Sequence, residues 1–190
     1  MIPVTYIVKV PAPLDDRTVQ TLLSFAPAEK QARIRRQRIR QNADNMLLGA
    51  ALARYLLWQE FRIPCTAVIA YGPYGKPYLA DYPKAHFNIS HSGQYVACSV
   101  CDRPVGIDIQ EIVPYRSEIA ANVCNMVELA HLDVSAEPAT EFARIWTKKE
   151  AFAKLTGNGI AGGLKDVTFP EDVHFQQFDY GMYMLAVAYL

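Results

Sequence analysis

The sequence predicts an α+β protein, built as a pseudo-dimer of two similar halves with a cleft between them. Three observations support this prediction. The order of elements repeats along the chain, each half reading as a strand, then helices, then further strands. No Ser/Gly-rich linker separates the halves. The 190 residues fit one ordinary domain or two half-domains sharing a core. We place the division between residues 1–103 and 104–190, and the repeat concerns element order only, without residue identity.

The first half is expected to begin with a strand at residues 2–10, which is rich in β-branched and aromatic side chains. A helix from Ala28 to Arg40 follows, because Pro27 stands where a first helical turn begins. A second helix near residues 44–61 is apolar almost all round, which predicts burial. The next expected elements are a strand near residues 66–71 and a hairpin with arms at 95–101 and 105–111, joined by 102–104.

The second half shares the strand at residues 105–111 as its first element. Two helices and three strands are expected after it. The helices are expected at about residues 116–132 and 138–156. The strands are expected near residues 165–169, 173–178 and 182–190.

Composition restricts the function classes. Lys plus Arg and Asp plus Glu both number 19, so the net charge is zero, which argues against a dedicated nucleic-acid binder. The N-terminus lacks the features of a signal peptide, and no stretch reaches 18 uncharged apolar residues. We therefore expect a cytoplasmic protein with no membrane partner. Cys98 and Cys101 fall on opposite faces of a strand, which favours buried reduced thiols over a zinc site.

One predicted strand, residues 105–111, carries a carboxylate between two isoleucines. Period-two alternation places Gly106, Asp108 and Gln110 together on the face opposite the apolar residues. Burying a carboxylate is costly unless it has a partner or a metal. The segment by itself leaves two possibilities open, a structural Asp108–arginine pair or a functional carboxylate.

A second candidate lies on the helix near residues 138–156. Trp146, Glu150 and Lys154 recur every four residues and therefore share one face. Glu150 and Lys154 could simply form an ion pair on the surface, which would contribute only about 0.3–0.5 kcal/mol to stability. The aromatic side chain on the same face favours partial burial instead.

Two further segments carry polar chemistry. The Ser90-His91 pair lies in a Gly-ended loop, which is typical of a phosphate-binding turn or of a plain turn, and the motif of a serine hydrolase is absent. Residues 24–41 hold six bases and one acid, a net charge of +5. Such a run is a solvated charged face or an anion site.

Taken together and in order, four segments resemble the Sfp-type 4′-phosphopantetheinyl transferases, from about Ser24 to the C-terminal strand. They are Gly75-Lys76-Pro77, Phe87-Asn88-Ile89-Ser90-His91-Ser92, Gly106-Ile107-Asp108-Ile109 and Trp146-Thr147-Lys148-Lys149-Glu150-Ala151-Phe152-Ala153-Lys154. The resemblance implies a pseudo-dimer with the active site between its halves. It also implies an enzyme that moves 4′-phosphopantetheine from coenzyme A to a serine of an acyl- or peptidyl-carrier protein, with release of adenosine 3′,5′-bisphosphate.

Site residues follow from the same resemblance. Asp108 and Glu150 match positions that bind Mg²⁺, with Gln110 a weaker ligand because many relatives have an acid there. Glu128 matches a further acidic position, which completes the metal site or helps to deprotonate the carrier serine. Lys154 would balance charge on the bridging or leaving phosphate.

Coenzyme A contacts are implied at positions in the first half, with Ser90 and His91 at the 3′-phosphate. The full set is Lys30, Arg33, Lys76, Ser90 and His91. Asn45 stands where relatives have an arginine. Together with Gln110, it motivates an alternative, an impaired homologue that binds coenzyme A or carrier without turnover. We expect a monomer with no nucleic-acid partner, and the sequence does not specify the carrier, the pathway or whether acyl-coenzyme A is accepted.

Overall fold

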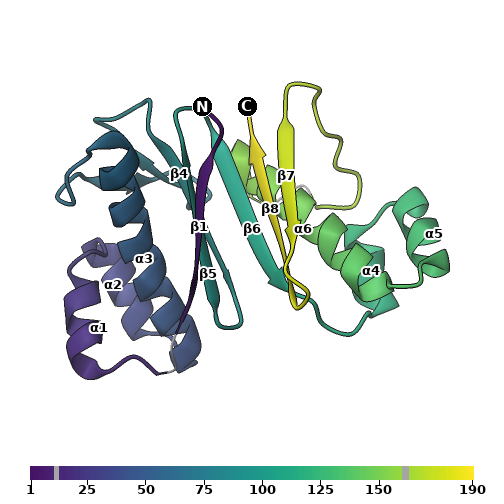
Figure 1. Ribbon diagram of the computed structural model, residues 1–190, viewed down its shortest axis with the longest axis horizontal. Helices are drawn as coiled ribbons and strands as arrows, with labels where there is room; N and C mark the ends of the chain where they lie inside the picture. Colours follow the sequence, from purple (N-terminus) through teal and green to yellow (C-terminus); the bar gives the residue numbers. More distant parts are fainter. Residues whose placement is uncertain (11–12, 160–162) are drawn as a thin grey trace.

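Strands at the centre of the structure separate two groups of helices (Figure 1). A computed structural model describes residues 1–10, 13–159 and 163–190. The helices in these residues are α1 (Asp16–Leu23), α2 (Ala28–Arg35), α3 (Arg40–Phe61), α4 (Ser117–Val123), α5 (Met126–Val134) and α6 (Pro138–Thr156). The strands are β1 (Val4–Lys9), β2 (Ile69–Tyr71), β3 (Pro77–Leu79), β4 (His86–Ser92), β5 (Tyr95–Cys101), β6 (Val105–Glu111), β7 (His174–Asp179) and β8 (Tyr183–Tyr189).

The predicted α+β class is confirmed, and the pairing of the strands repeats as well as their order. Two antiparallel three-stranded sheets have the orders β1-β5-β4 and β6-β8-β7. In each sheet the last strand along the chain lies in the centre. Strand β5 pairs with β1 and β4, and strand β8 pairs with β6 and β7. Three helices follow the first strand in both cases, α1–α3 after β1 and α4–α6 after β6. This common pattern fits the predicted pseudo-dimer.

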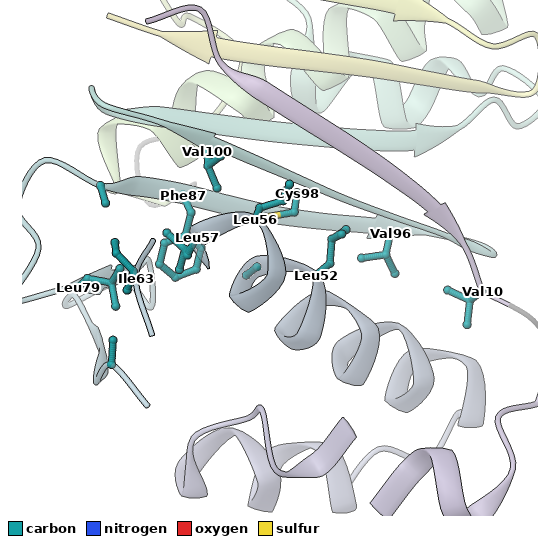
Figure 2. Close-up of a cluster of buried hydrophobic side chains, with 13 residues drawn as sticks. Val10, Leu52, Leu56, Leu57, Ile63, Leu79, Phe87, Val96, Cys98 and Val100 are labelled. Carbon is teal, nitrogen blue, oxygen red and sulfur yellow. The ribbon is translucent and has the colours of Figure 1, made fainter. Parts of the chain in front are cut away.

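Three apolar layers hold these elements together. Helix α3 packs on one face of the β1-β5-β4 sheet, with Leu52 and Leu56 close to Cys98 and Val96 (Figure 2). The two sheets pack against each other through a second cluster. Helix α6 covers the other face of the β6-β8-β7 sheet through small residues such as Ala151. Burying apolar surface is the main favourable contribution to folding.

The predicted hairpin of residues 95–101 with 105–111 is wrong. Strand β5 pairs with β4 through the turn at Gly93 and Gln94, and β6 pairs with β8 in the other sheet. Gly93 has a φ of +52°, a left-handed conformation that glycine adopts readily and that tight two-residue turns require. The segment with Pro104 instead connects one sheet to the other.

Several other expectations differ from the structure. Ser90 and His91 lie in strand β4 and not in a loop. Helix α2 ends at Arg35 rather than Arg40, because Ile34 is its one buried residue and little apolar contact holds the following turn. The helix expected at 116–132 is divided, since Asn125 caps a new helix in a capping box with Glu128. Residues 165–169 form a turn followed by irregular backbone, and not a strand. Helix α1 was not predicted, although Asp15 caps it by accepting from the Thr18 amide at 2.8 Å.

The two large sheets meet at β4 and β6, which share no backbone ladder. Side chains of β4 make the connection instead. The Asn88 Oδ1 atom accepts from the Ile107 amide at 3.1 Å, and the Ser92 Oγ atom accepts from the Glu111 amide at 2.9 Å. We call this junction the β4–β6 seam.

Cys98 and Cys101 are buried, as predicted, and they belong to the clusters on opposite faces of the first sheet. No helix within the described ranges is both long and apolar enough to span a membrane.

A glycine controls how closely α6 approaches β6. A Cβ atom added at Gly106 would overlap with the Ala151 carbonyl oxygen and the Leu155 amide nitrogen, and would lie 2.9 Å from the Leu155 Cα atom. These are backbone atoms, so neither neighbour can move aside by a rotamer change. The glycine therefore permits the contact that brings α6 side chains next to Asp108.

We predict that Gly106→Ala lowers the free energy of unfolding by about 1–3 kcal/mol, because the added methyl group forces α6 away from β6. Urea unfolding monitored by circular dichroism measures this. Gly72→Ala is the matched control, since its Cβ would lie 3.7 Å from the nearest atom, an ordinary contact. Equal stability losses in the two variants would contradict the prediction.

Candidate functional site

A three-member network joins the two sheets beside the seam. The Asp108 Oδ1 atom, on β6, lies 2.6 Å from the Lys154 Nζ atom of α6 and 2.7 Å from the Ser90 Oγ atom of β4. The Lys154 Nζ atom also donates to the Ser90 Oγ atom at 2.9 Å. Asp108 is only 5% exposed, so this ion pair is largely shielded from water and its attraction is stronger than that of a surface pair.

The second carboxylate of this cluster is Glu150, which precedes Lys154 by one helical turn and is 9% exposed. Burial raises the pKa of the Glu150 carboxyl and the neighbouring Asp108 carboxylate raises it further, while Lys154 opposes both. Lys154 pairs with Asp108, and no ion pair between Glu150 and a base is found among the described residues. With both acids ionised, the cluster has an excess of negative charge.

The cluster has the chemistry of a divalent-cation site. The Asp108 Oδ2 atom is buried and has no hydrogen-bond partner among the described residues, and a buried acceptor without a partner costs free energy. A cation beside it would satisfy this oxygen and also offset the charge that raises the Glu150 pKa. Mg²⁺ is bound in this way by one or two carboxylates, with water and substrate phosphate completing its shell.

A cationic pocket lies on the face of β4 opposite to this cluster. Its volume is about 460 Å³, and α2, α3, β4 and the segment around residues 71–77 line it. Lys30, Arg33 and His91 supply its basic groups, and Glu29 is its one acid. Burial lowers the pKa of Lys30, with a further contribution from Arg33. A group of cations that repel one another is suited to a ligand with several negative charges.

His91 lines the pocket from β4. Its side chain keeps an exposed face, but partial burial lowers its pKa, and the nearby Lys154 and Lys30 ammonium groups lower it further. Asp108 acts in the opposite direction. Charged groups of both the pocket and the acidic cluster therefore act on the His91 pKa.

Glu128 occupies a different environment from Asp108 and Glu150. It caps α5 by accepting from the Asn125 amide at 2.8 Å, and its Oε2 atom lies 2.6 Å from the Lys149 Nζ atom. In the described part of the chain, no three acidic, His or Cys side chains gather as a metal site. The structure thus brings Asp108 and Glu150 together without Glu128. Gln110, on the same face of β6, is partly buried.

Lys76 also points away from the pocket. Its Nζ atom donates to the Leu155 carbonyl at 2.8 Å and to the Val105 carbonyl at 3.1 Å. It therefore sits at the C-terminal end of α6, where carbonyl groups are unpaired and the helix dipole favours a positive charge. Asn45 lines the pocket and donates to the Gly93 carbonyl at 3.0 Å, so it holds the β4–β5 turn.

Sequence reasoning missed several residues that build this region. Lys149 is 1% exposed and bonds to Glu128 and to the Val123 and Lys165 carbonyls. Nothing in the sequence distinguishes it from its neighbour Lys148. Asn88 and Ser92 of the seam could have been found, because polar residues at every second position of a strand indicate a polar face.

Comparison with known proteins identifies the family. Residues 13–102 match the family model "4′-phosphopantetheinyl transferase, N-terminal", and residues 104–180 match "4′-phosphopantetheinyl transferase superfamily". The transferase psf-1 of Bacillus pumilus is 38% identical over 82% of this chain and 70% of its own length. The transferase Sfp of Bacillus subtilis (strain 168) is 34% identical over 78% and 68%. The transferase gsp of Aneurinibacillus migulanus is 35% identical over 80% and 65%.

The fold and these matches define the class of protein. It is a two-part α+β enzyme with an acidic cluster and a cationic pocket. The chain belongs to the 4′-phosphopantetheinyl transferase superfamily, and it is a transferase of the Sfp type. The family predicted from the sequence motifs is thereby confirmed.

The position of Lys76 generates a prediction about stability and pH. Burial lowers the pKa of Lys76 from 10.5 to about 8. Between these two values the unfolded chain binds more protons than the folded chain, so stability increases with pH. We expect Lys76 to add on the order of 1–2 kcal/mol to the rise in unfolding free energy between pH 7.5 and pH 9.5.

Urea unfolding of the wild type and of Lys76→Met at both pH values measures this increment, which the variant should lack. Lys84→Met, at an exposed position, is the matched control and should follow the wild type. If Lys76→Met retained the full rise with pH, the assignment to Lys76 would be wrong.

Proposed function

We propose that the protein transfers 4′-phosphopantetheine from coenzyme A to a serine of an acyl- or peptidyl-carrier protein, in a Mg²⁺-dependent reaction that releases adenosine 3′,5′-bisphosphate. The observation that carries the proposal is the buried Asp108–Lys154 pair with Glu150, separated only by β4 from a pocket lined by Lys30 and Arg33. A pyrophosphate ester needs both charge neutralisation and positioning, and these two features meet the two needs.

The pocket would hold the adenosine 3′-phosphate end of coenzyme A. Lys30, Arg33 and His91 offer cationic donors to phosphate oxygens, and the guanidinium group can bind two oxygens at once. Contact with the 3′-phosphate would also favour the protonated form of His91, against the surroundings that lower its pKa. A direct contact of coenzyme A with Lys76 stays a prediction, because this ammonium group is bonded to two carbonyls.

Asp108 and Glu150 would hold Mg²⁺, with Gln110 as a weaker ligand through its amide oxygen. The Asp108 Oδ2 atom is the acceptor that supports this assignment, since it is buried and has no partner among the residues described. When bound, the ion would neutralise negative charge on the pyrophosphate. Water can replace a missing carboxylate, because Mg²⁺ keeps several waters in most protein sites.

In the transfer step the carrier serine oxygen attacks the phosphorus atom that bears the pantetheine arm. The new P–O bond replaces the bond to the bridging oxygen, and the adenosine bisphosphate departs with the electron pair. Lys154 would stabilise the charge that develops on the leaving group. Glu128 as the group that helps to deprotonate the serine, or as a further metal ligand, stays a prediction, since its carboxylate pairs with Lys149.

The proposal includes a division of roles between residues 1–103, which supply the pocket, and residues 104–190, which supply the acidic cluster. The active site would lie where the two parts meet. The exposed bases of α2 and of the residues that follow it are suited to an acidic carrier surface. A monomeric state and a cytoplasmic location stay predictions.

Two departures from the family pattern support a second candidate, an impaired homologue that binds coenzyme A or carrier without turnover. Gln110 replaces an acid, and Asn45 replaces an arginine. Asn45 is engaged in holding the β4–β5 turn, which is a structural use of this position. The retained Asp108, Glu150 and Lys154 favour the active enzyme.

We predict that the protein with Mg²⁺ and coenzyme A adds the phosphopantetheine mass to an apo carrier protein, measured by mass spectrometry. Asp108→Asn and Glu150→Gln should each reduce this rate on the order of 10²-fold or more, because each removes a charge that the pyrophosphate site needs. Circular dichroism should show an intact fold in both variants.

The matched control is Glu171→Gln, a change of the same type at an exposed position. It should keep the wild-type rate. Full activity in Asp108→Asn or Glu150→Gln would remove the metal assignment. Binding without any mass shift, across a broad set of carriers, would favour the impaired homologue.

A further prediction concerns the pocket. Arg33→Ala should weaken coenzyme A binding on the order of tenfold, because it removes a charge-assisted contact with phosphate. Isothermal titration calorimetry without carrier measures this. Arg35→Ala removes the same charge from the same helix but at an exposed position outside the pocket. Equal weakening in both variants would show that net charge, and not a contact in the pocket, accounts for the effect.

A further inference from the structure

A second pocket lies at the start of α2 and shares no lining residue with the cationic pocket. Its volume is about 380 Å³. It is formed by the turn between α1 and α2, by α3, and by the segment that leads from α3 into β2. The lining residues are 24–27, Arg54 and 65–69. We call it the Arg54 pocket, because Arg54 is the one charged side chain among these described residues.

The Arg54 guanidinium group is buried without a counter-ion. Arg54 is 8% exposed, and the arginines that form ion pairs within the described ranges are Arg40 and Arg144. The Arg54 Nη1 atom donates to the Ala67 carbonyl at 2.5 Å, and the Nε atom lies 3.5 Å from the Phe25 carbonyl oxygen. Both acceptors are neutral. A buried charge with only neutral partners costs free energy, which a bound anion would offset.

The Nη2 atom of Arg54 is the donor that remains for a ligand. Its hydrogens find no acceptor among the described residues, where Arg54 donates through Nε and Nη1 only. The atom is also not sealed from solvent, because the sealed side-chain atoms without a partner in this part of the chain are Asp108 Oδ2 and the Tyr115 hydroxyl oxygen. Since Arg54 lines the pocket, this end of the guanidinium group faces the pocket.

The start of α2 is a second feature that favours an anion. Ala26 and Pro27 line the pocket and lead directly into α2. Pro27 is the N-cap residue and makes no side-chain cap hydrogen bond, and the N-terminal end of a helix attracts negative charge. Among the described residues that line the pocket none is acidic, and Glu29 of the first turn lines the cationic pocket instead.

We propose that the Arg54 pocket binds a small oxyanion group, as carried by a phosphate or a carboxylate, through the Arg54 guanidinium group and the first turn of α2. A guanidinium group is the donor best suited to the oxygen atoms of such groups. The bound anion would cap α2, the helix that carries Lys30 and Arg33 of the cationic pocket. The site would exist whether or not the protein transfers phosphopantetheine.

Cys65 provides a measurement that is specific to this pocket. It is the exposed cysteine and lines the pocket, whereas Cys98, Cys101 and Cys124 are buried. An anion held at Arg54 should shield the Cys65 thiol from iodoacetamide, a neutral reagent whose approach does not depend on charge. We expect inorganic phosphate, at about ten times its dissociation constant, to slow this alkylation on the order of tenfold, because about one pocket in ten is then empty.

The alkylation rate is measured by mass spectrometry, with sodium chloride of equal ionic strength as the reference. Acetate is tested in parallel. Protection by phosphate alone assigns the site to phosphate groups, protection by acetate alone assigns it to carboxylates, and protection by both supports a general oxyanion site.

Arg54→Gln should weaken the affinity of the protecting anion on the order of 10–100-fold, because it removes a charge-assisted hydrogen bond. Circular dichroism tests the fold of this variant. Arg54→Lys, which keeps the charge but loses the planar fork, replaces it if it does not fold, and should weaken the affinity in the same direction. Arg62→Gln is the matched control, at an exposed arginine that ends the same helix, and should be protected like the wild type.

Two results would overturn the proposal. If neither phosphate nor acetate slowed the alkylation of Cys65 in the wild type, the pocket would not bind an oxyanion. If a folded Arg54 variant were protected as well as the wild type, the anion would be bound elsewhere. Neither result bears on transfer to a carrier protein, so failure of this site and failure of the proposed function are read in separate experiments.

Discussion

The structure depends on how two sheets join without a shared backbone ladder. The apolar faces of the sheets attract each other, but burial of apolar surface has no direction and does not select one register. The hydrogen bonds that the Asn88 and Ser92 oxygen atoms accept from amides of β6 do select one. Both residues lie on the same face of β4, so a slip of one residue would turn these polar side chains away from β6. The register of the seam therefore decides which side chain meets Asp108.

Charge is arranged around this junction in a way that the zero net charge of the chain conceals. Cations gather in the pocket on one side of β4, and Asp108 and Glu150 lie on the other. Burying charge is costly unless it is paired, and Lys154 pairs with only one of the two acids. Burial raises the pKa of the Glu150 carboxyl, and the neighbouring Asp108 carboxylate raises it further. The single ammonium group of Lys154 does not balance both carboxylates.

The sequence predicted those features that depend on local periodicity. Alternation correctly separated Asp108 from the isoleucines of β6, and four-residue spacing correctly put Glu150 and Lys154 on one face of α6. Local periodicity did not predict features that depend on partners distant in the chain. Strand β6 pairs with β8 and not with β5, and the environment of Glu128 is set by Lys149. Both depend on packing, which no local pattern contains. The family motifs, taken together, indicated that the candidate residues belong to one site, which periodicity alone could not do.

The repeat of the fold explains why the two halves can have unlike roles. Each half has the same strand order and one long helix packed on its sheet, α3 in the first and α6 in the second. Each of these helices directs side chains toward the strand of its own sheet that lies at the seam, β4 for α3 and β6 for α6. Helix α3 directs Asn45 to the β4–β5 turn, whereas α6 directs Lys154 to β6. The cations of the pocket come from α2 and β4, whereas Glu150 and Lys154 come from α6. The two halves therefore repeat the same order of elements but carry different charged groups on them.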